Sequence, residues 1–140
     1  MNENVKTNKA PDPVGSYPHA RKVGNLLFLS GVGPRRPGTN VIPGVMMDGQ
    51  GNAVGHDIEA QCHSVFENVR IILKEAGSSW NNLIDITVFL TNMSRDFDIF
   101  NKIYSDYFTD NQPCRTTVEV NSLPTPIAIE LKCIIPIINC

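Results

Sequence analysis

The sequence has no long hydrophobic run and no apolar leader. A membrane helix needs about 20 consecutive apolar residues, and no stretch of this chain comes close to that length. The opening residues Met1–Lys6 are polar and lack the hydrophobic segment of a secretory signal. We therefore expect a protein that has no membrane partner and is located in the cytoplasm.

The charges show no strong bias of either sign. Twelve Lys and Arg residues stand against 14 Asp and Glu residues, which gives a formal net charge of −2. The sequence has no basic stripe and no Lys/Arg cluster, so it lacks the electrostatic footprint of a protein that binds nucleic acids or anionic lipids. We expect no nucleic-acid partner.

Cysteine is scarce, and the common catalytic motifs are missing. The four cysteines (Cys62, Cys114, Cys133 and Cys140) form no C-x-x-C pair and none of the usual zinc-ligand spacings. Without an export signal, reduced thiols and no metal site are expected. The sequence also lacks the phosphate-binding loop, the G-x-S-x-G elbow, the H-E-x-x-H motif and the dinucleotide fingerprint.

The composition is that of one globular domain. The chain has 140 residues, of which 41% are hydrophobic and 19% are charged. Residues 1–13 are polar and contain two prolines, which predicts a flexible N-terminal arm before a single domain over residues 14–140. Residues 32–56 are rich in Pro and Gly and predict a long connection, which in a compact domain is usually functional or disordered.

Turn residues and apolar periodicity predict an α+β fold. A tight turn at Gly24-Asn25 joins two strands, and an apolar stripe that follows Asp57 predicts a helix to about Ala76, stopped by Gly77. The other expected elements are a strand at 84–90, a helix from about 94 or 96 to 108, and strands at 115–121 and 127–135. The order β-β-α-β-α-β-β, with hairpins at both ends, predicts a two-layer domain with both helices on one sheet face.

One sheet face is left without a cover in this arrangement. Two helices can cover only one face, yet residues 26–31 are continuously apolar and predict a strand that is buried on both sides. The simplest partner for the uncovered face is another copy of the chain, so we expect a homo-oligomer that packs its sheets together.

Two charged residues on the predicted strands are candidates for chemistry. Arg115 begins a strand otherwise made of Thr, Val and Glu, and Glu130 lies in the middle of an apolar strand. A carboxylate in such a strand is seldom deeply buried without a partner. Two interpretations stay open: an exposed face or structural ion pair, or an Arg that clamps a carboxylate ligand beside a Glu that handles a proton or a water.

A series of short segments, in order along residues 14–136, carries a family resemblance. The segments are Ser16–Ala20, Val23–Gly31, Asp57–Gln61 with Glu67-Asn68, Ala76–Ser79, Val88–Met93, Pro113–Val120, Leu123-Pro124 and Ile129-Glu130. Together they resemble the RidA/YjgF family of imine and enamine deaminases. The resemblance implies a chorismate-mutase-like fold, a trimer with active sites in the clefts between subunits, and no cofactor.

The resemblance also implies roles for individual residues. Arg115 would bind the substrate carboxylate, and Glu130, kept ionised by the nearby cation, would hold the attacking water. Tyr17, Ser30 and Asn101 would line the cleft. The residues alone leave other readings open, in which Tyr17 is a packing aromatic, Ser30 only closes a strand, and Asn101 is a surface residue.

The chain departs from most members of the family after Ser30-Gly31. Where most members continue with Gln-Ile/Thr-Pro-Leu, this chain has Val32–Gly38 with Arg35 and Arg36, and the connection that follows is longer than usual. These features resemble the 2-aminomuconate deaminase branch. That branch implies hydrolytic loss of ammonia from 2-aminomuconate to give 4-oxalocrotonate, in aromatic-amine catabolism.

A dicarboxylate substrate gives the two loop arginines a possible task. One Arg in the cleft would leave the distal carboxylate unpaired, and Arg35 and Arg36 would bind it, although a solvated pair on a loop is the alternative. Two other functions stay open. The chain is either a generalist deaminase of small 2-imino acids such as 2-iminopropanoate, or a non-catalytic module that binds small carboxylates or proteins.

Overall fold

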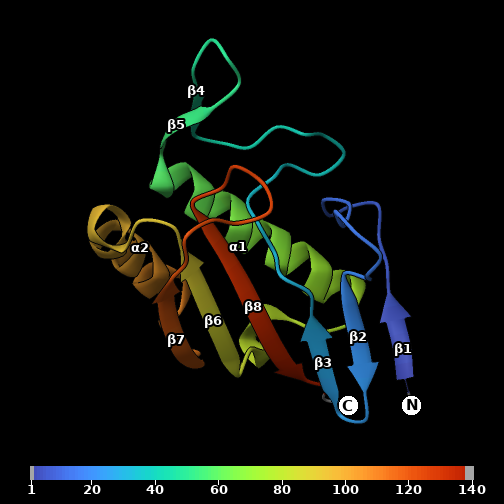
Figure 1. The fold of residues 1–140 in the computed structure, drawn as a ribbon. Coiled ribbons are helices and arrows are strands. Elements are labelled where there is room, and N and C mark those ends of the chain that lie inside the picture. The colour runs from blue at the N-terminus through green and yellow to red at the C-terminus, as the bar shows by residue number, and fades with distance from the viewer. Residues whose placement is uncertain (1, 138–140) are drawn as a thin grey trace.

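Two helices lie on one side of a six-stranded sheet in the computed structural model, which describes residues 2–137 (Figure 1). The sheet has the order β1-β2-β3-β8-β6-β7. Its strands are β1 (Asn2–Val5), β2 (Ala20–Val23), β3 (Leu26–Leu29), β6 (Asp85–Leu90), β7 (Cys114–Glu119) and β8 (Ile129–Pro136). The helices are α1 (Ile58–Glu75) and α2 (Met93–Tyr107), with a short 3₁₀ turn at Trp80–Asn82. The predicted two-layer α+β domain is confirmed.

The ends of the helices follow the capping rules. The Asp57 side chain accepts a hydrogen bond from the main-chain N–H of Ala60 at 3.3 Å, which satisfies a free donor at the start of α1. Gly77 follows the end of α1 with φ +78°, a conformation that favours glycine. Helix α2 begins a residue before the predicted start, because Asn92 caps it by accepting from Arg95 N–H at 3.0 Å.

The sheet differs from the prediction at its C-terminal end. Strands β6 and β7 are parallel and joined through α2, and β6 lies between β7 and β8. The predicted hairpin between the last two strands therefore does not form. A tight turn cannot join the parallel strands β6 and β7, so α2 connects them as a crossover. The connection after β7 then passes β6 to reach β8 on its other side.

The N-terminal residues are not a loose arm over their whole length. Strand β1 pairs with β2 in antiparallel register, with Val5 opposite Ala20, and Ala10 is only 1% exposed. This strand could not be predicted from the sequence, because its first three residues are polar and show no alternation of apolar and polar residues. The connection at 32–56 holds a second element that the pattern missed, the two-stranded hairpin of β4 (Val45–Met47) and β5 (Ala53–His56).

The core lies between the helices and one face of the sheet. Leu27 and Leu29 of β3 are fully buried, whereas Leu26 is 36% exposed and Phe28 is half-buried. Buried and exposed side chains thus alternate along β3, and a single chain does not cover both faces of this strand. Phe28 shares the outer face with Ile134, its partner on β8. An oligomer that covers this outer face stays a prediction.

Neither α1 nor α2 is long and apolar enough to cross a membrane, and the same holds for every helix within residues 2–137.

Cys62 and Cys133 are free and buried, and burial raises the pKa of both thiols to about 12. Cys114 is free and exposed. The described part of the chain holds no cluster of three or more His, Cys, Asp or Glu side chains that could bind a metal, and Cys140 lies outside it.

Candidate functional site

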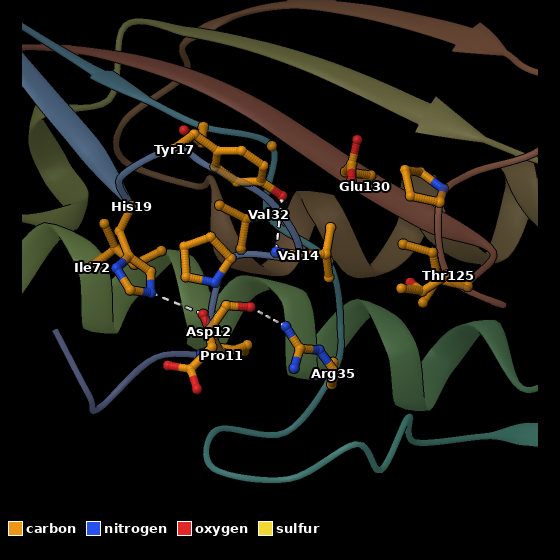
Figure 2. Close-up of a pocket in the computed structure, with 16 residues that line it drawn as sticks. Pro11, Asp12, Val14, Tyr17, His19, Val32, Arg35, Ile72, Thr125 and Glu130 are labelled. Carbon is orange, nitrogen blue, oxygen red and sulfur yellow. Dashed lines mark hydrogen bonds between the residues drawn. The ribbon is translucent and has the colours of Figure 1, made fainter. Parts of the chain in front are cut away.

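A small cavity opens where the N-terminal segment passes the ends of β3 and β8 (Figure 2). Its volume is about 80 Å³, which is enough for several water molecules or a short acid. Four of the predicted site residues line it: Tyr17, Ser30, Arg35 and Glu130. They come from segments far apart in the sequence, which the sheet order brings together.

Glu130 supplies the carboxyl group of the cavity. It lies on the outer face of β8, and a Cβ added to Gly31 would stand 2.9 Å from its Oε2 atom. Glycine at position 31 therefore allows the carboxyl to approach the main chain. Within residues 2–137 no hydrogen bond or ion pair involves the Glu130 carboxyl, and its burial raises its pKa. The expected low pKa is not found in a single copy of the chain, because within residues 2–137 no cation offsets the burial.

Gln61 of α1 positions the strand that carries Glu130. It is fully buried, its Oε1 accepts the main-chain N–H of Ala128 at 2.8 Å, and its Nε2 lies 2.9 Å from Nδ1 of His56. Gln61 thus fixes Ala128, which directly precedes β8 and lies two residues before Glu130. Gln61 lies in the Asp57–Gln61 segment that resembles the family, but a buried glutamine in a helix carries no signal of its own, so the sequence predicted no role for it.

Arg35 is placed by two polar side chains of α1. Asn68, which is 1% exposed, donates to the carbonyl oxygens of Gly33 at 2.9 Å and Arg35 at 2.8 Å. Ser64 donates to the Pro34 carbonyl at 2.6 Å. These bonds hold the segment after β3 against the helix, so Arg35 is presented from an anchored loop. Its guanidinium donates to the carbonyl of Asp12, toward which it turns in Figure 2, on the far side of the cavity from Glu130.

Two more side chains fasten the N-terminal segment over the cavity. The Tyr17 hydroxyl accepts the N–H of Val14 at 3.2 Å. His19, which is 6% exposed, receives the N–H of Thr7 on Nδ1 at 3.3 Å, so its Nε2 carries the proton and donates to the Pro11 carbonyl at 2.8 Å. Together with Arg35 these bonds hold residues 11–14 as one wall of the cavity. The sequence offered a signal for His19, which lies in the Ser16–Ala20 segment, but no role was assigned to it.

Ser30 has a task within the fold. Its hydroxyl donates to the Pro18 carbonyl at 2.7 Å, and its main-chain N–H donates to the His19 carbonyl at 3.0 Å. These two bonds tie the end of β3 to the turn that carries Tyr17. Ser30 therefore lines the cavity and also maintains its shape.

Three predicted site residues lie outside this cavity. Arg36 and Asn101 are exposed, and neither lines the cavity. Arg115 is opposite Ile86 in the sheet register, so it faces the helices, whereas Glu130 is opposite Phe89 on the outer face. Two strand spacings and three residues along the strands separate Arg115 from Glu130, a Cα distance on the order of 14 Å with the sheet between the two side chains.

The comparisons with known proteins agree with this architecture. The family model described as Endoribonuclease L-PSP matches residues 7–137. The chain belongs to this family. A RutC family protein from Pyrococcus abyssi is 40% identical over 132 residues, which are 94% of each chain. The RidA/YjgF resemblance is thus confirmed at the level of the family.

Two further members carry functional information in their names. Reactive Intermediate Deaminase A, a chloroplastic protein of Arabidopsis thaliana, is 36% identical over 132 residues, which are 94% of this chain and 64% of the relative. The crystal structure of TdcF of E. coli with bound serine has a TM-score of 0.81 and 30% identity, covering 96% of this chain and 98% of that one. The Endoribonuclease L-PSP family therefore includes a deaminase and a protein that holds a short amino acid.

Proposed function

We propose that this member of the Endoribonuclease L-PSP family is a cofactor-independent deaminase that hydrolyses short 2-imino acids and their enamine tautomers. The observation that carries the proposal is the Glu130 carboxyl, which faces a cavity and has no hydrogen-bond partner within residues 2–137. A carboxyl with a raised pKa is a better general base near neutral pH than an ordinary one. The deaminase of Arabidopsis and the bound serine in TdcF support the same reaction class.

The proposed reaction needs one water and no other reactant. An enamine first tautomerises to the imine. Glu130 takes a proton from the water as the oxygen bonds to the imine carbon, and it returns that proton to the nitrogen. The hydroxyl proton of the resulting carbinolamine then passes to the nitrogen. The C–N bond breaks with its electron pair on nitrogen, the oxygen forms the carbonyl group of the 2-oxo acid, and ammonia leaves. Arg115 would bind the substrate carboxylate in two parallel bonds, which its planar guanidinium favours.

A site that uses both Arg115 and Glu130 requires a second copy of the chain. In one chain the two side chains face opposite sides of the sheet, so a short acid cannot contact both. We therefore propose a homo-oligomer, a trimer as the family resemblance implies, in which Arg115 of one copy approaches the cavity of another. The half-buried Phe28 and Ile134 on the outer face support such packing, because they lack a cover within one chain.

The decisive experiment measures ammonia release. An amino-acid oxidase acting on alanine generates 2-iminopropanoate in situ, and the purified protein is expected to accelerate the formation of pyruvate and ammonium above the spontaneous rate. Binding of pyruvate without acceleration of any imine or enamine would instead identify a binding module. Cleavage of RNA without deamination would contradict the proposal and agree with the family's descriptive name, although the net charge of −2 disfavours RNA.

A second candidate substrate is 2-aminomuconate, and one observation favours it. Arg35 lines the same cavity as Glu130. A residue that binds the distal carboxylate of the substrate must lie in this position. Arg36, which was also predicted to bind the distal carboxylate, is exposed and lies outside the cavity. We keep the short imino acids as the first proposal, because the named deaminase and the serine-bound relative fit them without a second carboxylate.

Arg35→Ala and Arg36→Ala form a matched pair that tests the dicarboxylate. A charge-assisted hydrogen bond contributes about 1.5–3 kcal/mol, so Arg35→Ala is expected to raise KM for 2-aminomuconate by about 10- to 150-fold and KM for 2-iminopropanoate far less. Arg36→Ala is expected to change neither. Equal losses on both substrates in Arg35→Ala would mean that Arg35 mainly holds the N-terminal segment through Asp12. No loss on 2-aminomuconate would remove Arg35 from substrate recognition.

A further inference from the structure

Three aromatic rings of α2 surround the guanidinium of Arg115. The Cζ atom of Arg115 lies 5.9 Å from the ring centre of Phe97, 5.4 Å from that of Phe100 and 4.6 Å from that of Tyr104. The rings also contact one another, with centroid distances of 6.5 Å between Phe97 and Phe100 and 5.6 Å between Phe100 and Tyr104. We call Phe97, Phe100 and Tyr104 the aromatic platform.

The platform follows from the sequence of α2 and the sheet topology. Positions 97, 100 and 104 are spaced three and four residues apart, so they lie on one stripe of the helix. Helix α2 is the crossover between the parallel strands β6 and β7, which lays this stripe against the helix-facing side of β7. Arg115 projects from that side, since it is opposite the buried Ile86 in the register.

The guanidinium keeps its hydrogen-bond donors free. Within residues 2–137 the Arg115 side chain makes no hydrogen bond or ion pair, and its interactions are those with the three rings. An ion pair would occupy its N–H groups, whereas a ring attracts the charge through its face and leaves the five N–H donors available.

Tyr104 contacts Arg115 as a neutral ring. Burial raises the pKa of Tyr104 to about 12, although the Arg115 charge opposes the shift, so no phenolate neutralises the cation at neutral pH. The Tyr104 hydroxyl is buried and has no hydrogen-bond partner within the described residues. The ring face, and not the hydroxyl, is therefore the part of Tyr104 that acts on the guanidinium.

We propose that Phe97, Phe100 and Tyr104 are positioning residues that hold the Arg115 guanidinium ready for a carboxylate ligand. The platform restricts the long Arg side chain before the ligand arrives, so less side-chain freedom is lost on binding. It does this without a competing carboxylate that a ligand would have to displace. The inference rests on the proposed role of Arg115 as the anchor of the substrate carboxylate.

The test compares Tyr104→Leu with two reference variants. Tyr104→Phe keeps the ring and removes the hydroxyl. Tyr107→Leu removes a ring from the same helix that packs on Phe66, at a centroid distance of 4.5 Å. Tyr104→Leu is expected to raise both KM for 2-iminopropanoate and the dissociation constant of pyruvate by about 10-fold, with a smaller change in kcat. Tyr104→Phe and Tyr107→Leu are expected to stay within about 2-fold of the unmodified protein.

The outcomes separate this inference from the proposed function. Thermal unfolding checks that each variant is folded, and Tyr104→Met, which keeps the apolar volume without a ring, carries the same expectation if Tyr104→Leu does not fold. Unchanged KM and pyruvate binding in a folded Tyr104→Leu or Tyr104→Met variant would overturn the platform, and so would an equal loss in Tyr107→Leu. If the unmodified protein binds pyruvate but deaminates nothing, the proposed function fails, while the pyruvate constants still decide whether the platform positions Arg115.

Discussion

Arg115→Lys is expected to abolish most of the deaminase activity while the protein stays folded. Lysine keeps the charge but has no planar fork, so it cannot make two parallel bonds to a carboxylate. Loss of one charge-assisted bond costs about 1.5–3 kcal/mol, which predicts a fall in kcat/KM of about 10- to 150-fold. Steady-state kinetics on 2-iminopropanoate, with circular dichroism and size-exclusion chromatography as checks on folding and assembly, measure this effect.

The matched control for this variant is Arg70→Lys. Arg70 on α1 also lies over aromatic rings, with its Cζ 5.0 Å from the ring centre of Trp80, but unlike Arg115 it forms an ion pair within residues 2–137, with Glu67 at 3.6 Å. Arg70→Lys is expected to retain nearly normal kcat/KM. Near-normal turnover in Arg115→Lys, or an equal loss in both variants, would remove Arg115 from the role of carboxylate anchor.

Glu130→Gln is expected to lower turnover by a factor on the order of 10² or more while pyruvate binding survives. Glutamine preserves the shape and hydrogen-bonding capacity of the side chain but cannot accept the proton of the attacking water. Glu67→Gln, which alters an exposed carboxylate on α1, is the control and is expected to behave like the unmodified protein. If Glu130→Gln weakens binding but leaves kcat at saturation unchanged, Glu130 binds substrate and does not activate water.

The pH dependence gives the same assignment a second readout. Burial raises the pKa of Glu130 above the ordinary glutamate value of 4.5, and the ionised form is the base. Activity should therefore rise with pH along an acidic limb centred above 4.5, and this limb should be absent in Glu130→Gln. The stability contribution has the opposite sign. Because the folded state disfavours the charge, stability relative to Glu130→Gln is greatest below 4.5 and is lost as pH rises through the raised pKa.

The local elements of the fold could be predicted because they depend on neighbouring residues. The Gly24-Asn25 turn, the Asp57 cap and the stop at Gly77 follow from backbone preferences, and the structure reproduces all three. Strand β1 could not be found in this way, since polar residues at a sheet edge are held by main-chain pairing with β2 and leave no apolar pattern. The prediction of a hairpin between the last two strands was wrong for a related reason. The crossover through α2 places β7 on the far side of β6 from β8, and no local pattern shows this strand order.

The candidate residues could be named from short segments, but their relative positions could not. Tyr17, Ser30, Arg35 and Glu130 meet at one cavity only because β3 lies beside β8. Nothing in the neighbouring pair Arg35-Arg36 shows which of the two enters the cavity. That choice is made by Asn68 and Ser64, which bond to the main chain of residues 33–35 from another element.

The alternation of strands and helices, the family and the residue types available for chemistry could be predicted from the amino-acid sequence alone. These properties depend on neighbouring residues or on the sum of all residues, so residue spacing and composition are enough to predict them. The tertiary structure decided that Glu130 is half-buried with a raised pKa and that Arg115 rests on three rings of α2. It also decided that the two residues face opposite sides of one sheet. Such facts depend on strand register and on which elements pack together, and contacts between distant residues set both.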